Sequence, residues 1–280
     1  MSLFIESLKI GLCENYKKII NKTLEYIGIV FILTELIQIV LTQVAINKVF
    51  FMTVLFICPI IGIINSRQKK SIQIISNTMD LKIIVEFGDI FNKNGIIAIS
   101  VNEYFDSIVD DKHVSPVSLH GKLIMNYFDG HPEGFDKCVD ESLINVEYKL
   151  VKRPSGRERQ YNIGTTAVVS AYKKKFLCVV LSKTDLTTYK ASANMNYLMI
   201  ALDGMLNKAR DESSGNPLYI PLMGAGLSGT GINPKHILQV TIIKIIEISK
   251  KQKICDEIHI VLPENRFKEI DLDSIKRFWR

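Results

Sequence analysis

Two apolar runs, separated by two polar residues, dominate the first quarter of the chain. Residues 27–46 read IGIVFILTELIQIVLTQVAI and residues 49–64 read VFFMTVLFICPIIGII, with Asn47 and Lys48 between them. A helix needs about 20 largely apolar residues to cross a bilayer, with a usable range of about 17–25. The first run meets this length, and Lys48 can reach the interface and lengthen the shorter second run. The pattern predicts a transmembrane helical hairpin over 27–64.

Two other readings of these runs are less consistent with the pattern. A buried helical hairpin in a large soluble core is the main alternative, but neither run carries the broad polar face of a surface-packed helix. A cleaved signal peptide does not fit, because the apolar stretch starts late, is doubled, and is not followed by a small-residue cleavage site.

Basic residues flank the hairpin on both sides and are scarce in its turn. By the positive-inside rule, both flanks stay in the cytosol, so we expect a two-helix, multi-pass protein of the cell inner membrane with a cytoplasmic N-terminus and a cytoplasmic downstream domain. The formal charge of +6 then reflects topology and attraction to anionic lipid. No interleaved aromatic and basic stripe indicates nucleic acid, so none is predicted as a partner. The flanking basic residues are Lys17, Lys18, Lys22, Arg67, Lys69 and Lys70.

The first run also contains a polar face. Glu35, Gln38 and Thr42 are spaced three and four residues apart and therefore lie on one side of a helix. Such a face is costly in a membrane unless it meets another helix or water. Its polar side chains either form hydrogen bonds between packed helices or line a pore built from several copies. Both readings predict a homo-oligomer.

The remainder of the chain has the pattern of an α/β domain. We divide the sequence into an N-terminal cytosolic segment (1–26), the hairpin (27–64), a polar linker (65–80) and a folded domain (81–280). Short apolar runs predict buried strands, and periodic runs between them predict helices, which together indicate a mixed sheet flanked by helices. The predicted strands are 81–87, 95–101, 166–172, 175–181, 217–222 and 257–262, and the predicted helices are 116–128, 191–212 and 233–251.

A glycine-rich loop follows the strand at 217–222. The segment MGAGLSGTG (223–231) runs directly into a helix that begins near Pro234. Glycine lets backbone N–H groups approach an anion, and a helix N-terminus adds free donors and partial positive charge. The loop is therefore a candidate phosphate cradle, although a tight structural turn would show the same glycines. It is not a P-loop, because no GK[ST] follows. Ser228 lacks an identifiable base and is not assigned as a nucleophile.

A second candidate site residue follows the first strand of the domain. Asp89, in Gly88-Asp89-Ile90, can accept a hydrogen bond from an exocyclic amine, but an aspartate that caps a turn would look the same. No metal site is predicted, because the five cysteines are scattered without a CxxC pair and the histidines lack ligand spacing. We read the cysteines as reduced and cytosolic.

These segments together resemble a macro domain, the ADP-ribose-binding α/β module, over roughly 81–270. The resemblance rests on GDI (88–90), IIAISVN (96–102), IGTTAVV (163–169) and IPLMGAGLSGTG (220–231). It implies that Asp89 binds the adenine amine beside the Ile90 backbone, and that Gly164 and Thr165 help to enclose the ligand. It also implies that the late loop cradles the diphosphate and distal ribose. That loop comprises Gly224, Ala225, Gly226, Leu227, Ser228, Gly229, Thr230 and Gly231.

Two segments depart from the catalytic members of that family. The region that is asparagine-rich in the hydrolases reads SVNEYFDS here and keeps one candidate, Asn102. The loop VSPVSLHGK (114–122) is also atypical, and it supplies His120 as a residue that can close over the ligand. A histidine at the surface, or one satisfied within the fold, would look the same in the sequence.

A membrane hairpin followed by a divergent macro domain is similar to the macro-domain effectors of type II Thoeris antiphage defence systems. The resemblance implies a partner TIR-domain enzyme that makes an ADP-ribose-derived signal, such as a histidine adduct, from NAD. The expected function is a non-catalytic effector without cofactor that oligomerises on ligand binding and disrupts the membrane. The alternatives are a membrane-tethered ADP-ribosyl hydrolase, with Asn102 as its candidate residue, and a nucleotide sensor that scaffolds other proteins.

Overall fold

The computed structural model describes residues 16–40, 48–75, 80–110, 112–226 and 229–279. The chain divides into two compact units. The first comprises the segment up to Lys70 together with Asp271–Ser274, and the second comprises Ser71–Ile270 together with the residues from Ile275 onward.

The first unit contains two helices that pack along each other, α2 (Tyr16–Val40) and α3 (Lys48–Ser66). Gly62 lies against α2, where an added Cβ would come within 2.5 Å of the Thr23 hydroxyl oxygen. The Asn65 amide donates to the Tyr26 hydroxyl at 2.8 Å. A small residue at the crossing and a hydrogen bond between helices are the usual features of a close membrane-helix pair.

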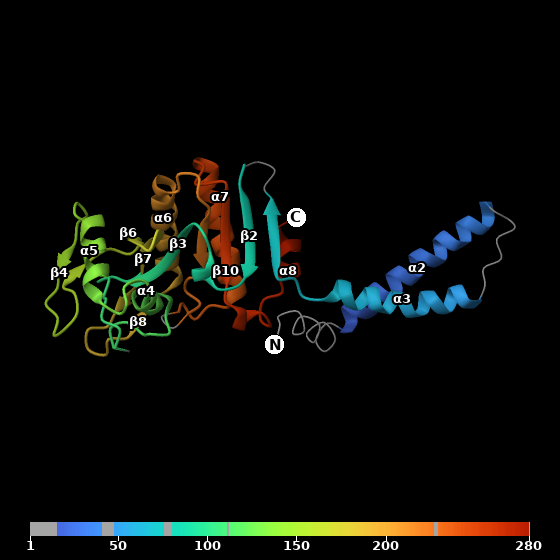
Figure 1. Cartoon of the computed structure of the whole chain (residues 1–280), viewed down its shortest axis with the longest axis horizontal. Helices are drawn as coiled ribbons and strands as arrows, with labels where there is room; N and C mark the ends of the chain where they lie inside the picture. The colour runs from blue at the N-terminus through green and yellow to red at the C-terminus, as the bar shows by residue number, and fades with distance from the viewer. Residues whose placement is uncertain (1–15, 41–47, 76–79, 111, 227–228, 280) are drawn as a thin grey trace. The chain divides into compact units, whose positions relative to one another are not determined.

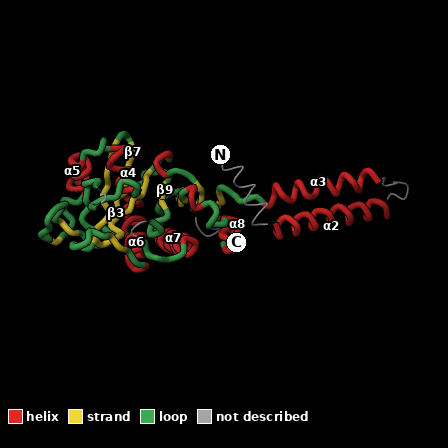
Figure 2. The backbone as a smooth tube through the Cα atoms, turned by 90° about the horizontal axis from the view of Figure 1, so that it is seen from below, coloured by secondary structure: helices red, strands yellow, loops and turns green. Residues whose placement is uncertain are grey.

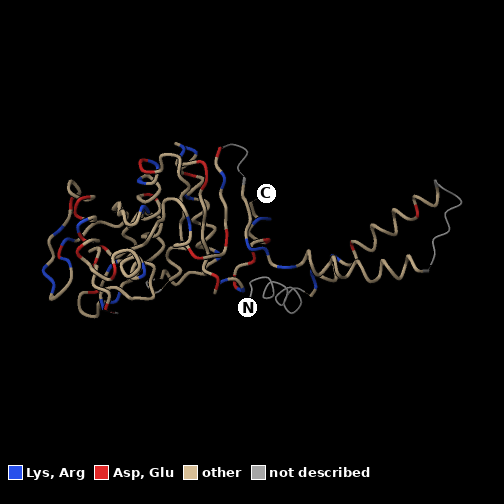
Figure 3. The backbone as a smooth tube through the Cα atoms, viewed as in Figure 1, with Lys and Arg blue, Asp and Glu red and all other residues tan. Residues whose placement is uncertain are grey.

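The two helices differ as candidate membrane spans. Within α3, the window Val49–Ser66 has a mean hydropathy of 2.2 and is the one described helical stretch that is long and apolar enough to cross a membrane. Figure 3 shows no charged residue along that window, whereas α2 carries acidic residues along its length. The prediction of a second span at 27–46 stays a prediction, because residues 41–46 of that run lie outside the described residues.

Most large apolar side chains of this unit are exposed. Both Glu35 and Gln38 of the predicted polar face are exposed as well, and Thr42 lies outside the described residues. The helix that carries them starts at Tyr16 and continues through residue 26, so the boundary expected there between an N-terminal segment and a first span stays a prediction. The exposed apolar residues include Ile32, Leu33, Ile39, Met52, Leu55, Phe56 and Ile60.

The second unit is built on a mixed sheet with the order β1-β2-β10-β9-β3-β7-β6, and β8 pairs with β7. The five central strands are parallel, and β1 and β6 are antiparallel edges. Each of the six predicted strands is present. The strands of this sheet are β1 (Ser71–Ile75), β2 (Lys82–Phe87), β3 (Ile96–Asn102), β6 (Thr166–Ala171), β7 (Lys174–Thr184), β8 (Ala191–Ser192), β9 (Leu218–Pro221) and β10 (Glu257–Leu262).

Residues 71–75 form strand β1, so the segment 65–80, which was expected to be a linker, is in part a strand of the sheet. Its residues alternate between the core and solvent, with Ile72 and Ile74 buried and Ser71 and Gln73 exposed. This is the pattern of a half-buried edge strand. Five residues inside a polar stretch carry too little of that alternation to be recognised, and pairing with β2 decides the outcome.

Helices cover both faces of the sheet, so the unit has three layers (Figures 1 and 2). Helices α6 and α7 lie on one face, and α4 and α5 lie on the other. The three predicted helices are confirmed, but the segment from 129 to 165 also forms α5 and a small hairpin that the sequence did not indicate. The bounds are α4 (Leu119–Tyr127), α5 (Pro132–Ser142), α6 (Met195–Glu212), α7 (Pro234–Lys251) and α8 (Leu272–Phe278), with the hairpin β4 (Lys149–Leu150) and β5 (Arg159–Gln160).

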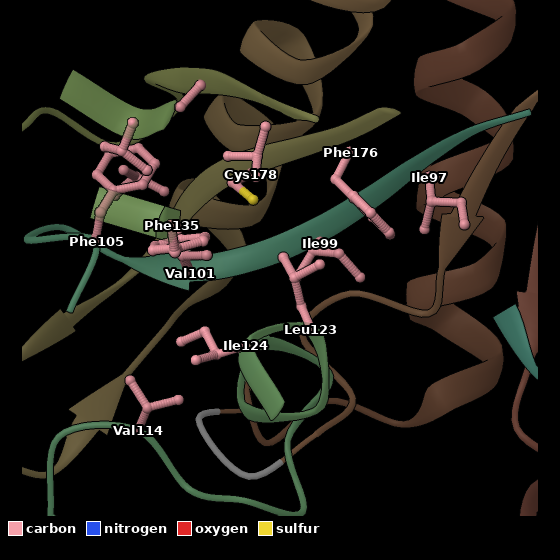
Figure 4. Packing of buried hydrophobic residues seen from close by; sticks show 14 of the residues in the cluster. Ile97, Ile99, Val101, Phe105, Val114, Leu123, Ile124, Phe135, Phe176 and Cys178 are labelled. Atoms are coloured by element: carbon pink, nitrogen blue, oxygen red, sulfur yellow. The ribbon is translucent and has the colours of Figure 1, made fainter. Parts of the chain in front are cut away.

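The core on the α4 side explains why β3 reads as an unbroken apolar run. Ile97, Ile99 and Val101 point from β3 toward this layer, where Leu123 and Ile124 of α4 meet them (Figure 4). Ile96 and Ala98, on the opposite face of β3, are buried as well. A parallel strand covered on both faces needs apolar residues at successive positions. This packing fixes where β3 ends and thereby places Asn102 at the carboxyl edge of the sheet.

Candidate functional site

A cleft of about 1140 Å³ crosses the carboxyl ends of the parallel strands. Its lining includes Asp89 after β2, Gly224 after β9 and Asn102 at the end of β3. Ligands of open α/β sheets bind outside the carboxyl ends of the strands, because the loops and helix N-termini converge there. The cleft therefore has the position of a ligand site and is large enough for a small organic ligand.

One end of the cleft is formed by the turn after β2. The Asp89 carboxylate accepts a hydrogen bond from the Phe91 N–H at 3.0 Å and caps the short 3-10 helix η1 (Ile90–Asn92). Ile90 and Phe91 are buried and anchor this turn, while Asp89 itself is exposed at the cleft. Capping and ligand binding are compatible, since a carboxylate can accept several hydrogen bonds.

The glycine-rich loop forms the middle of the cleft. Gly224 has a φ of +80°, and its carbonyl accepts the N–H of Thr230 at 2.9 Å, which closes the loop on itself. Gly229 passes so close to the Gly226 carbonyl that a Cβ would lie 2.6 Å from that oxygen. Glycine is needed where the chain turns with positive φ or where two backbone segments touch. Leu227 and Ser228 lie outside the described residues.

Arg266 holds this loop from the other side. It belongs to the 3-10 helix η2 (Glu264–Arg266), and its guanidinium donates to the Ala225 carbonyl at 3.1 Å and pairs with Glu269 at 2.6 Å. Arg266 lines the cleft, as do Gly224, Ala225, Gly226 and Gly229. Thr230 and Gly231 do not line the cleft. The Thr230 hydroxyl instead donates to the Gly224 carbonyl at 3.3 Å.

His120 lies on the cleft wall in the first turn of α4. Ser118 caps this helix by accepting the Gly121 N–H at 2.9 Å, and the His120 ring packs 5.3 Å from the ring of Phe135. Burial lowers the pKa of His120 to about 4, against a smaller opposing effect of the Asp106 carboxylate, so the ring is neutral at pH 7. Its Nε2 is buried and has no hydrogen-bond partner among the described residues. A neutral ring with an unsatisfied nitrogen in a cleft can hydrogen-bond a ligand.

Asn102 is occupied by its own loop. Its amide group donates to Asp106 at 2.9 Å, and its carbonyl oxygen accepts the N–H groups of Tyr104 at 3.3 Å and Asp106 at 3.1 Å. The Asp106 carboxylate in turn forms a bidentate, fully buried pair with Arg153 at 2.8 and 3.0 Å. Asn102 therefore fixes the wall of the cleft through a rigid polar network.

Gly164 and Thr165 do not line the cleft. Gly164 lies against α6, where a Cβ on Gly204 would come within 2.0 Å of the Gly164 carbonyl oxygen. Thr165 pairs through its carbonyl with the Val180 N–H at 2.9 Å. Together the two residues connect the sheet to the helix layer that contains α6. The IGTTAVV motif therefore indicates close packing at that contact.

The structure also brings residues into the cleft that sequence analysis missed. Lys112, His113, Lys122, Tyr189 and Lys190 line it. Together with Arg266, this gives four lysines and arginines against the two carboxylates of Asp89 and Glu264. The excess of positive charge favours an anionic ligand. The signal available in the sequence was weak, since only the position of Arg266 shortly after a predicted strand pointed to the cleft. Among the described residues, no cluster of histidine, cysteine and acidic residues has the arrangement of a metal site.

Known proteins share this architecture. The model of the family described as "Thoeris protein ThsA, Macro domain" matches residues 83–263. The Thoeris protein ThsA of Bacillus amyloliquefaciens (strain Y2) is 30% identical over 207 residues, which are 69% of this chain and 66% of that protein, just under two thirds of its length. The fold is similar to that of an Oceanobacillus iheyensis macrodomain with ADP (TM-score 0.52, 13% identity, 74% of this chain and 96% of that one). It is equally similar to the same macrodomain with MES bound (TM-score 0.51, 14% identity, 74% and 96%).

Proposed function

The chain belongs to the Thoeris ThsA macro-domain family, and from that membership we propose that it is a non-catalytic, membrane-anchored effector of an antiphage defence system. Its macro domain binds an ADP-ribose-derived signal nucleotide made from NAD by a TIR-domain enzyme. Binding drives the chain to oligomerise and to disrupt the membrane.

The glycine-rich loop in the cleft is the observation that carries the ligand assignment. Gly224, Gly226 and Gly229 lie beside Arg266 on a cleft wall with excess positive charge, which suits a diphosphate. Asp89 lies two strands away, at β2, and takes the amine of the adenine there, with the Ile90 backbone beside it. In this arrangement the distal ribose extends from the loop toward β3, where His120 of α4 lines the cleft.

The macro-domain hydrolase reading gains no support from Asn102. Both polar groups of its side chain are engaged within the 102–106 loop, so it holds the loop in shape and is poorly placed to orient a reacting water. This supports a receptor in preference to an enzyme.

The membrane role rests on the first unit. Helix α3 is long and apolar enough to span a bilayer, and α2 packs along it with a largely apolar, exposed surface. Placed in a bilayer, these surfaces face lipid or other copies of the chain, and the polar face with Glu35 then faces a neighbouring helix or water. The macro domain is cytoplasmic, where a TIR enzyme would release its product.

Calorimetric titration of the full chain in detergent micelles tests the ligand assignment. We expect ADP-ribose, or more strongly its histidine adduct, to bind wild-type protein, and Gly226→Glu to weaken binding at least tenfold. The new carboxylate faces the diphosphate in a part-exposed cleft, where two unit charges about 5 Å apart interact by up to about 3 kcal/mol at an effective dielectric of about 20.

The matched control is Gly226→Gln, which has the same size without the charge. Among the described residues, nothing lies within 4 Å of a Cβ at Gly226, and its φ is not positive, so both variants are expected to fold. Equal binding by all three proteins, or no binding by wild type, would contradict the assignment.

A further inference from the structure

The small hairpin of β4 and β5 has an exposed outer edge. The two strands form a sheet of their own, so no described strand pairs with the far side of β4. All residues from Ile144 to Leu150 are exposed. Ile144 and Leu150, at 78% and 73% exposure, are the two most exposed large apolar residues among those described in the second unit. Figure 1 shows β4 at the margin of that unit.

The hairpin is fixed to the domain through β5. Arg159 of β5 pairs with Asp140 of α5 at 3.3 Å. Tyr161, the residue after β5, donates its N–H to the Glu103 carbonyl at 2.8 Å. Because β5 is held from the domain side, β4 is the outer strand of the hairpin, and its shape is set before any partner arrives.

The hydrogen bonds of the hairpin show which backbone groups point outward. The Val151 N–H donates to the Glu158 carbonyl at 2.9 Å. Opposed residues of an antiparallel pair alternate between hydrogen-bonded and non-hydrogen-bonded pairs. Leu150, which lies opposite Arg159, therefore directs its N–H and C=O away from β5, and so does Tyr148 two residues earlier. These groups are available to another strand.

The main sheet protects its corresponding edge. On β6, the Val168 N–H donates to the Ser142 hydroxyl of α5 at 2.7 Å, and α5 packs along that strand. On the outer side of the hairpin, neither the N–H nor the C=O of Tyr148 forms a hydrogen bond within the described part of the chain. The neighbouring Glu147 and Lys149 form no ion pair with another described residue.

The sequence of this edge is complementary to itself. If two copies of β4 pair antiparallel around a two-fold axis at Tyr148, Glu147 of each copy lies opposite Lys149 of the other. Tyr148 then meets Tyr148 of the other copy, and Val146 meets Leu150. Opposite charges and apolar pairs directly across two strands stabilise their pairing, and like charges oppose it. An axis at Lys149 would place two ammonium groups opposite each other, so the charges favour the axis at Tyr148.

We propose that the outer edge of β4 is a contact surface between two copies of this chain, which pair antiparallel around a two-fold axis at Tyr148. Such a contact is isologous and closes as a dimer. It is short, and it forms when the membrane unit confines the copies to one surface and raises their effective concentration. The inference rests on the proposed function and deepens it, since it names the surface through which copies associate.

Oxidative cross-linking of the full chain in proteoliposomes tests the register. Tyr148→Cys places two cysteines at a hydrogen-bonded antiparallel pair, with Cα atoms about 5.5 Å apart, inside the range of about 4.4–6.8 Å for disulfides. Lys149→Cys is the matched control, because its copies would be two residues out of register and about 8 Å apart. We expect at least threefold more dimer from Tyr148→Cys than from Lys149→Cys or from wild type, whose five native cysteines set the background.

Charge reversal tests the pairing across the axis. Added to Tyr148→Cys, Glu147→Lys places like charges opposite each other twice and should lower the dimer yield at least threefold. Further addition of Lys149→Glu restores opposite charges and should restore the yield. Asp211→Lys, at an exposed acidic position on α6, is the control that should leave the yield unchanged.

Equal yields from Tyr148→Cys and Lys149→Cys, or a yield that does not respond to the charge reversal, would overturn the inference. The nucleotide titration separates this outcome from a failure of the proposed function, because the substituted residues lie outside the cleft. Normal nucleotide binding without the cross-link would overturn the inference alone. The cross-link in a chain that binds no nucleotide would overturn the proposed function and leave the contact surface.

Discussion

Burial decides the charge state of His120, which lies on the wall of the cleft. His120, in the first turn of α4, is buried against Phe135, and the loss of hydration lowers the pKa of its ring to about 4. Sequence analysis could identify His120 as a loop residue of interest, but not that it is neutral and lacks a partner for Nε2.

His120 should therefore make the unfolding free energy fall in acid. The unfolded chain takes up a proton on this ring below about pH 6.5, whereas the folded protein does so only near pH 4. Stability is lost progressively as the pH falls through this window, by an amount on the order of 3 kcal/mol at the acid end. Urea unfolding of the full chain at several pH values should show a steeper loss in wild type than in His120→Gln. Parallel pH profiles would show that His120 is protonated in the folded state.

Helix α6 and the sheet approach each other through two glycines. A Cβ on Gly204 would lie 2.0 Å from the carbonyl oxygen of Gly164, and one on Gly164 would lie 2.8 Å from the carbonyl oxygen of Ile200. The IGTTAVV segment resembles part of a ligand loop in sequence, yet in this protein its glycine serves the packing of a helix.

Gly204→Ala is expected to destabilise the protein by about 1–3 kcal/mol. The higher helix propensity of alanine favours the variant by up to about 1 kcal/mol, but the new methyl group must push α6 away from the sheet. Denaturant unfolding measures the difference. Asp211→Ala, at an exposed position on the same helix, carries a propensity gain without the clash and should leave stability unchanged or raise it slightly. A neutral or stabilising effect of Gly204→Ala would mean that the contact relaxes freely.

The polar face of α2 should matter for membrane damage and not for ligand binding. Glu35→Leu removes the carboxylate that an assembled set of helices would enclose, so we expect toxicity to cells to be lost while nucleotide affinity stays within twofold. Ile39→Leu, an exposed and apolar position on the same helix, is the matched control. Growth assays on induction, beside calorimetry on purified protein, check both parts. Full toxicity in Glu35→Leu would contradict the hypothesis that the helices assemble into a pore lined or sealed by this polar face.

The chain contains two units of different character, one apolar and helical and the other an α/β domain. A ligand can shift such a protein between states only by binding one of them more tightly. The proposed function requires that the assembled state be the tighter binder, since otherwise nucleotide binding would leave the membrane unit unaffected.

Ligand-driven assembly is the corresponding prediction. Light scattering of the full chain in detergent should show an increase in mass when a saturating adduct of ADP-ribose is added, at protein concentrations where the free chain is smaller. Gly226→Glu should not assemble, and Gly226→Gln should. Assembly that is complete without ligand would assign the control of membrane damage to some other step.

The sequence by itself determined the central strands, the main helices, the glycine-rich loop, the apolar helix α3 and the macro-domain family. Each of these is encoded by neighbouring residues, through hydrophobic periodicity or a contiguous motif, so no tertiary contact is needed to read them. The short edge strand β1 and the segment from 129 to 165 were missed because pairing and packing with distant parts decide them.

Only the tertiary structure decided which residues face the cleft. In the folded chain Gly164 packs against a helix, and Asn102 belongs to the hydrogen-bond network of its own loop. Arg266 contacts the glycine-rich loop at Ala225, although the two residues are 41 positions apart in the sequence. The contact of His113, Ser155 and Tyr189 is the clearest case, since these residues meet across separations of 42 and 34 residues. No local pattern records such meetings, because the sheet order that brings these loops together is a property of the whole fold.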